Sequence, residues 1–149
     1  ESIKFCIATR NDLTGTIKKD KKIKQLIEEG RVEIIHGRPL SEPQINESYK
    51  KSFCIFNIYR RSTQSGVLPK AFMFGTPVIA NNIGSFPEFI KNGKNGFLID
   101  EFDKTNIYEK IIFIKNNLNV FTKEARNTFL ETFYWRNNVN IKKINQLVC

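Results

Sequence analysis

A run of small and polar residues from Thr63 to Leu68 has the composition of an anion-binding loop. Pro69 follows it, and proline is tolerated only in the first turn of a helix because it lacks a backbone N–H group. The helix that ends at Gly75 must therefore begin near Ser65. That start leaves backbone N–H groups available for a phosphate at the positive end of the helix dipole. The residues of this predicted loop are Thr63, Gln64, Ser65, Gly66, Val67 and Leu68.

Two features of the sequence favour a ligand site over an ordinary helix start. Gly66 carries no side chain that would block the approach of an anion, and the three residues before it add polar side chains. A helix start capped by Ser65 with no ligand stays open as the simpler interpretation.

The elements that would position this loop follow from hydrophobic periodicity. Short apolar runs predict strands at residues 3–9, 32–35, 53–59, 77–80 and 97–99. Helical spacing and capping residues predict helices at 21–29, 42–51, 66–74 and 85–93, a helical stretch over 103–133, and a last segment from 135. Strands that alternate with helices form right-handed βαβ units, so we predict an α/β fold, a Rossmann-like parallel sheet with helices on both faces. The loop then lies at the carboxyl edge of the sheet, where such folds bind ligands.

The segment from Thr63 to Ala80 resembles the donor-site segment of glycosyltransferase family 4. Asn82–Glu88 and Asn92–Leu98 continue the resemblance in order, and Phe133–Trp135 is similar to a late element of the family. The resemblance implies that residues 1–149 form one sugar-nucleotide-binding, Rossmann-like domain, the C-terminal half of a GT-B enzyme. It also implies kinship with bacterial O-antigen and capsular polysaccharide glycosyltransferases.

The function that this resemblance implies is a retaining transfer of a hexose or N-acetylhexosamine. The donor would be a nucleotide sugar, with a UDP-sugar expected, and the acceptor a lipid-linked oligosaccharide of a surface polysaccharide. The family needs no metal or other cofactor, and it places no certain catalytic residue in this half. The loop from Gln64 to Val67 would hold the diphosphate and the sugar. The loop formed by His36, Gly37, Arg38, Pro39 and Leu40 would hold the base.

The chain departs from the family pattern at two positions and at its start. The family commonly carries two glutamates around the loop, where this chain has Ser62 and Lys70, so the ribose clamp and an acidic sugar contact are missing. Lys70 is then either a further diphosphate ligand or a solvated lysine of the first helical turn. The family also implies an N-terminal acceptor domain and a first βα unit before Glu1, without which we expect donor binding but no turnover.

Charge and composition limit the alternative functions of the chain. The chain has 149 residues and a net charge of +9, and its densest basic run is Lys18–Lys24. This run is either a solvated helix face or a patch for an anionic partner, so a non-enzymatic basic module that binds nucleic acid or an anionic membrane is the alternative function. Aromatic residues do not interleave with the basic ones, so no nucleic acid is expected. Without a spanning apolar stretch or a signal peptide we expect a cytoplasmic protein, peripheral at most on the inner membrane.

The remaining predictions concern single residues. Cys6 and Cys54 lie in apolar runs and are predicted to be buried thiols of a reducing compartment. His36 is the only histidine and lacks neighbours at metal-ligand spacing, so no metal site is expected. Glu88 is read as part of a capping box begun by Ser85. Arg60 and Arg61 precede the loop and are candidates for a positive charge near a diphosphate.

Overall fold

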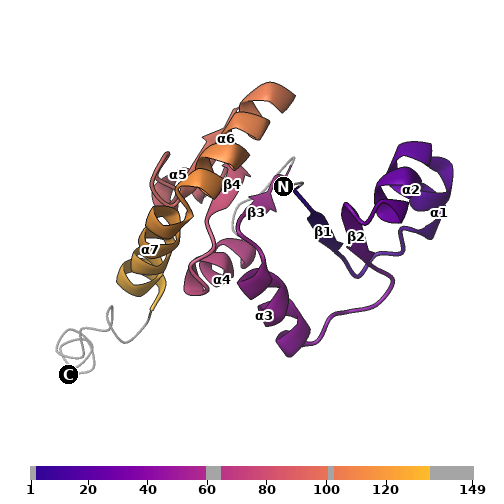
Figure 1. Cartoon of the computed structure of the whole chain (residues 1–149). Helices are drawn as coiled ribbons and strands as arrows, with labels where there is room; N and C mark the ends of the chain where they lie inside the picture. The colour runs from indigo at the N-terminus through magenta and orange to yellow at the C-terminus, as the bar shows by residue number, and fades with distance from the viewer. Residues whose placement is uncertain (1–2, 60–64, 101–102, 135–149) are drawn as a thin grey trace, which may run out of the picture. The chain divides into compact units, whose positions relative to one another are not determined.

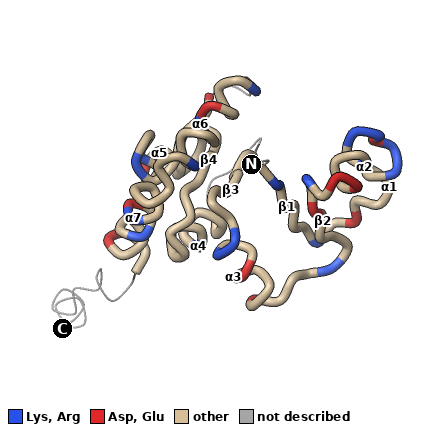
Figure 2. Tube along the Cα trace, in the orientation of Figure 1, with Lys and Arg blue, Asp and Glu red and all other residues tan. Residues whose placement is uncertain are grey.

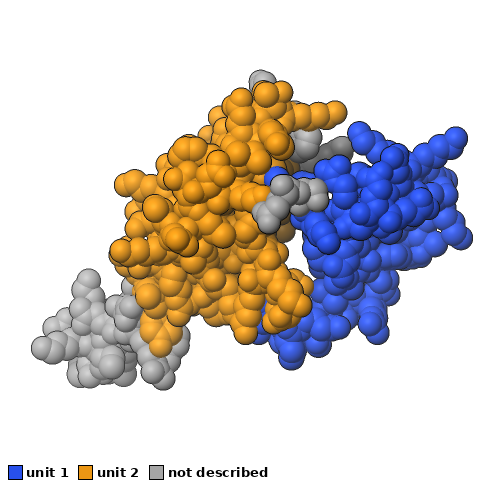
Figure 3. Space-filling view, viewed as in Figure 1, with its two compact units in different colours: residues 1–46 blue, residues 47–149 orange. Residues whose placement is uncertain are grey.

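The computed structural model describes residues 3–59, 65–100 and 103–134 of the chain (Figure 1). It divides into two compact units, Glu1–Asn46 and Glu47–Cys149, which Figure 3 shows in different colours. Each unit contains its own parallel sheet. The predicted segment from Trp135 and the predicted site residues Thr63 and Gln64 lie outside the described residues.

The first unit contains two parallel strands and two helices. They are β1 (Phe5–Ala8), α1 (Thr14–Lys19), α2 (Lys21–Glu28) and β2 (Val32–Ile35). The strands pair in register with Phe5 opposite Val32, and α2 contacts β2. The predicted helix at 21–29 is confirmed, but α1 was not predicted. Its six residues contain one strongly apolar side chain, Ile17, so they show no helical period.

The second unit contains the larger sheet and most of the helices. α3 (Glu42–Lys51) crosses from the first unit into it. The three strands are parallel in the order β3-β4-β5. The elements after α3 are β3 (Ile55–Asn57), α4 (Val67–Met73), β4 (Val78–Asn81), α5 (Phe86–Phe89), β5 (Gly96–Ile99), α6 (Lys104–Asn116), α7 (Leu118–Thr128) and the π-helix η1 (Phe129–Phe133).

The hydrophobic core of the second unit joins α4 to β4, α5 and α7. Its fully enclosed members include Phe72 of α4 and Ala125 of α7, both with 0% exposed surface. Leu68, in the first turn of α4, is part of the same cluster. This burial fixes where α4 begins, and therefore where the loop before it ends. The apolar residues at helical spacing over 103–133 are partly confirmed as core. Buried are Ile107, Ile111, Ile114, Phe121 and Ala125, whereas Leu118, Phe129 and Phe133 are half-buried.

The predicted α/β fold class is confirmed, since parallel strands alternate with helices throughout the described chain. The strands form one sheet in each unit. Two burial predictions are wrong. Cys6 is exposed because its strand, β1, is exposed along its length. The nearly continuous apolar run at 53–59 also predicts a strand covered on both faces, but Phe56 of β3 is 38% exposed. Cys54 is half-buried, and burial raises the pKa of its thiol to about 12.

The two predicted capping boxes differ in outcome. At the start of α3, the Gln44 side chain accepts a hydrogen bond from the Ser41 backbone N–H at 3.0 Å, which is one half of a capping box. At the start of α5 the Ser85 side chain makes no capping hydrogen bond. Instead the Glu88 N–H donates to the Ser85 backbone oxygen at 3.1 Å. The structural role predicted for the Ser85 and Glu88 side chains is therefore wrong.

Candidate functional site

Polar side chains follow all three strands of the second unit at their carboxyl ends. Asn57 ends β3, Asn81 ends β4, and Asp100 follows β5. Because the strands are parallel, these ends meet at one edge of the sheet, and the Asn82 side-chain amide donates to Asp100 Oδ1 at 2.9 Å. This is the edge at which open α/β sheets bind their ligands.

Two asparagines form hydrogen bonds with the described residues on either side of residues 60–64. The Asn57 side-chain amide donates to Ser65 Oγ at 3.0 Å, and Asn57 is only 2% exposed. On the other side of residues 60–64, the Tyr59 N–H donates to Asn81 Oδ1 at 2.8 Å. The Tyr59 ring also stacks on Phe86, with 6.4 Å between ring centroids. Ser65 of the predicted loop and Tyr59, which precedes that loop, are thus attached to the carboxyl edge of β3 and β4.

The described part of the loop lies directly before α4, as predicted. Ser65 Oγ accepts a hydrogen bond from the Val67 N–H at 3.3 Å, so one predicted N–H group already has a partner. A Cβ atom added to Gly66 would meet nothing within 4 Å, and Gly66 is exposed, which leaves this part of the backbone open to a ligand. Leu68 faces the core, so it could contribute only through its backbone. Lys70 is half-buried in the middle of α4. Arg60 and Arg61, like Thr63 and Gln64, lie outside the described residues.

Sequence reasoning missed the asparagines of this edge. A signal for them was present, because Asn57, Asn81 and Asp100 are each the first polar residue after an apolar strand. In a parallel sheet, such residues gather at the ligand-binding edge. Their position in the sequence therefore predicts their placement, although it does not show which of them is buried.

The predicted base-binding loop lies in the first unit, at the carboxyl end of β2. His36 is half-buried, whereas Gly37, Arg38 and Pro39 are exposed and Leu40 is half-buried. The Gly37 N–H donates to the Asn11 oxygen at 3.2 Å, which ties this loop to the one after β1. Gly37 adopts a φ of +80°, a left-handed conformation that favours glycine. Both loops thus stand at the carboxyl edge of the two-stranded sheet.

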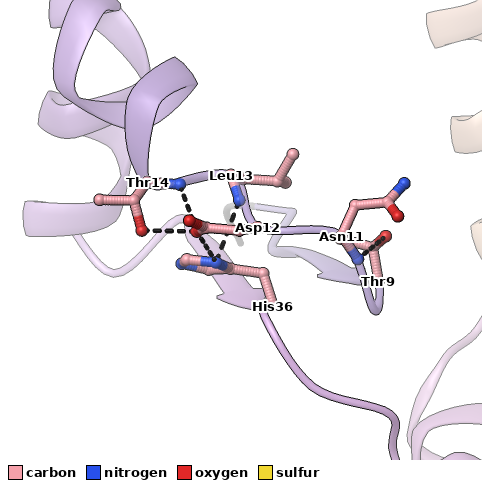
Figure 4. A network of polar contacts seen from close by, with 6 residues as sticks. All are labelled: Thr9, Asn11, Asp12, Leu13, Thr14 and His36. Carbon is pink, nitrogen blue, oxygen red and sulfur yellow. Dashed lines mark hydrogen bonds and ion pairs between the residues drawn. The ribbon is translucent and has the colours of Figure 1, made fainter.

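His36 connects the two loops through one ring nitrogen (Figure 4). Its Nδ1 lies 3.2 Å from the Leu13 backbone nitrogen and 3.3 Å from Asp12 Oδ1. A neutral ring with its lone pair on Nδ1 accepts the Leu13 hydrogen bond, whereas a protonated ring pairs with Asp12. Sequence reasoning assigned no role to Asp12, and His36 was expected to contact the base rather than this carboxylate.

The pKa of Asp12 is lowered, first by hydrogen bonds from the Thr14 side chain and backbone and then by His36. The lowered value stabilises the folded state above the pKa of the unfolded chain, about 3.9. That contribution is lost as the pH falls through the folded-state pKa. We therefore expect Asp12→Asn to lower the urea midpoint at pH 7, with the difference from the wild type closing toward pH 2. A difference that stays constant between these pH values would contradict the charge effect, since Asn keeps an oxygen for the same hydrogen bonds.

Within the described residues, no group of three or more His, Cys, Asp or Glu side chains could hold a metal ion. No helix in the same part of the chain is long and apolar enough to cross a membrane. The carboxyl edge of the second unit's sheet presents amide, hydroxyl and carboxylate groups.

Residues 2–117 match the protein family described as "Glycosyl transferases group 1". A search of the curated proteins gave no match. The matched region includes the carboxyl edges of both sheets.

Solved structures share the fold over nearly the whole chain. TarM is 23% identical with a TM-score of 0.71, over 95% of this chain and 28% of TarM. The Anabaena protein HepE, in complex with UDP, is 21% identical with a TM-score of 0.62, over 98% of this chain and 39% of HepE. The C-terminal domain of LpcC, a glycosyl transferase group 1 family protein of Francisella tularensis, is 14% identical with a TM-score of 0.65, over 89% of this chain and 86% of that domain. The chain thus spans 28% and 39% of the length of the first two proteins and most of the LpcC domain.

Proposed function

Since the chain belongs to the glycosyl transferases group 1 family, we propose that it forms the donor-binding half of a retaining GT-B glycosyltransferase. The family match is the observation that carries the proposal. The likeness to the separately solved C-terminal domain of LpcC, 86% of which is covered, supports a C-terminal donor domain as the role of this chain.

The proposed donor is a UDP-sugar that carries a hexose or N-acetylhexosamine. The presence of UDP in the HepE structure supports this choice of nucleotide. The diphosphate and the sugar would lie at the carboxyl edge of β3 and β4, against the backbone of Ser65–Val67. The family resemblance adds Thr63 and Gln64, which lie outside the described residues. The loop from His36 to Leu40 would contact the base, and Lys70 would add a positive charge from α4.

The proposed chemistry is displacement of UDP by an acceptor hydroxyl with retention of the anomeric configuration. This half would position the donor and stabilise charge. Hydrogen-bond donors held at the edge of the sheet stabilise the negative charge that develops on the leaving diphosphate. No cofactor is proposed beyond the donor itself. The proposed acceptor is a lipid-linked oligosaccharide of a surface polysaccharide, of the O-antigen or capsular type, elongated at the cytoplasmic face of the inner membrane.

Amide shifts on titration with UDP and UDP-glucose test the donor site. We expect the shifts to centre on Ser65–Leu68, and Gly66→Trp to weaken UDP binding at least about tenfold, which corresponds to about 1.4 kcal/mol. The substitution should leave the fold intact, because a Cβ atom at Gly66 meets nothing within 4 Å and its φ is −66°.

Gly15→Trp is the matched control for this titration. Gly15 lies in α1, and a Cβ atom there also meets nothing within 4 Å, so this variant should bind UDP like the wild type. UDP shifts that leave Ser65–Leu68 unchanged, or equal affinities of the two variants, would disprove the proposed diphosphate site.

A further inference from the structure

Five lysines surround the turn between α1 and α2 in the first unit. We call this surface the lysine corner, and its members are Lys18, Lys19, Lys21, Lys22 and Lys24. A single residue, Asp20, separates the two helices, and all five lysines are exposed. Figure 2 shows the basic residues of both helices on the tube around this turn.

The lysines of the corner form no ion pair with a described residue. Within residues 3–59, 65–100 and 103–134, the ion pairs are His36–Asp12 and Lys51–Glu47, so the corner takes part in none. The one acidic residue inside it, Asp20, accepts hydrogen bonds from the N–H groups of Lys22 and Ile23 at 2.9 and 3.0 Å. Asp20 is therefore oriented toward the start of α2 as its cap.

The position of the lysines on α2 works against the stability of that helix. The N-terminal end of a helix carries a partial positive charge and favours acidic residues. The first turn of α2 contains Lys21, Lys22 and no acidic residue, while Glu28 ends the helix. Asp20 at the N-cap offsets part of this charge, and Lys18 and Lys19 lie in the last turn of α1, where the helix dipole favours basic residues. The gathering of five exposed lysines around one turn therefore indicates a role outside the fold.

We propose that the lysine corner docks the protein on a bilayer that contains anionic lipid. Lysines are compact point charges that suit a plane of phosphate headgroups, and each contributes near such a surface. A nucleic-acid surface is less well matched, because residues 14–30 contain no aromatic side chain to stack on a base and no arginine for bidentate contacts. The proposal rests on the proposed function for its context, a lipid-linked acceptor that is present only at a membrane.

The expected strength of binding to an anionic bilayer follows from the number of lysines in the corner. Each lysine near an anionic surface strengthens binding about fivefold at low ionic strength. Replacing four of them should therefore weaken binding by roughly several hundredfold. The variant K18Q/K19Q/K21Q/K22Q should fold like the wild type, because all four lysines are exposed. Removing Lys21 and Lys22 from the first turn of α2 offsets the removal of Lys18 and Lys19 from the last turn of α1.

Sedimentation with lipid vesicles tests the proposal on the 149-residue chain. The vesicles consist of phosphatidylcholine alone or of phosphatidylcholine with phosphatidylglycerol. The matched control K91Q/K94Q/K104Q/K123Q removes the same charge from exposed lysines of the second unit. We expect the wild type and the control to bind only the vesicles with phosphatidylglycerol, more weakly as salt rises, and the corner variant to lose this binding.

Three results would overturn the proposal. They are absence of wild-type binding to anionic vesicles, equal losses in the corner variant and the control, and binding to single-stranded RNA but not to vesicles at about 150 mM salt. A UDP titration of the same proteins separates this inference from the proposed function. If vesicle binding depends on the corner while the wild type binds no UDP, the docking surface stands and the donor site fails. If UDP binds and the corner has no effect on vesicles, the donor site stands and the docking surface fails.

Discussion

Replacing Gly96 with alanine is expected to lower the free energy of unfolding by about 3 kcal/mol, the upper range for inserting a group into a packed site. Gly96 begins β5 and lies opposite Val78 of β4. A Cβ atom built on Gly96 would stand 2.1 Å from the Val78 carbonyl oxygen, and 3.1 and 3.2 Å from its carbonyl carbon and its nitrogen. All three obstacles are backbone atoms, so no side-chain rotation relieves the collision.

The strand that would have to move is the central one of the three. Val78, Ile79 and Ala80 of β4 have 0% exposed surface, which leaves them little freedom to shift. Displacing β4 would also move Asn81, whose side chain accepts the hydrogen bond from the Tyr59 N–H before the loop. We therefore expect the Gly96→Ala variant, where it still folds, to bind UDP more weakly as well.

Urea denaturation followed by circular dichroism measures the effect, with Gly15→Ala as the control. Gly15 lies in α1 with nothing within 4 Å of an added Cβ atom, so alanine there should stabilise the protein by about 0.5–1 kcal/mol. A Gly96→Ala midpoint close to that of the wild type would show that the two strands separate easily at this position.

The order of elements was predictable because it depends on hydrophobic spacing. The apolar residues of α6 and α7 recur at helical intervals and are buried where that spacing places them, for example Ile107, Ile114 and Phe121. α1 was missed because its lysines and threonines leave one apolar residue in six positions. A helix of that composition depends on tertiary contacts and caps, such as the Asp12 oxygen that accepts from the Thr14 N–H, which no periodicity reveals.

The placement of the predicted loop followed from the sequence, whereas its contacts did not. Alternation of strands and helices places the loop before α4 at a sheet edge, and the structure confirms that placement for Ser65–Leu68. The anchors Asn57 and Asn81 were not identified, because spacing treats an asparagine as a polar surface residue whether it is exposed or enclosed. Burial of a polar side chain depends on partners that are distant in sequence, as Asn57 and Ser65 show.

Asn95 is another buried asparagine whose partners the sequence does not reveal. Its replacement is the second substitution for which we expect a large loss of stability. With Gly96, Asn95 reads as a turn, but its side chain is 1% exposed and joins three segments. Its Oδ1 accepts from the Lys91 N–H at 2.8 Å, and its Nδ2 donates to the Phe89 oxygen and to Thr128 Oγ1, both at 2.9 Å. One side chain thus connects the segment after α5 with the start of β5 and the end of α7.

Asn95→Ala is expected to lower the free energy of unfolding by about 3 kcal/mol. The substitution leaves the Lys91 N–H and the Phe89 oxygen without their partner at a buried position, and each such group costs about 1–3 kcal/mol. Asn92→Ala is the matched control, because Asn92 is exposed and its Oδ1 accepts a single hydrogen bond, from the Leu98 N–H at 2.7 Å. Water can replace that bond, so the control should lose about 1 kcal/mol or less. The urea midpoints of the two variants measure the difference in their free energies of unfolding. Equal losses of stability would mean that water reaches Asn95 and that its three hydrogen bonds do not hold the segments together.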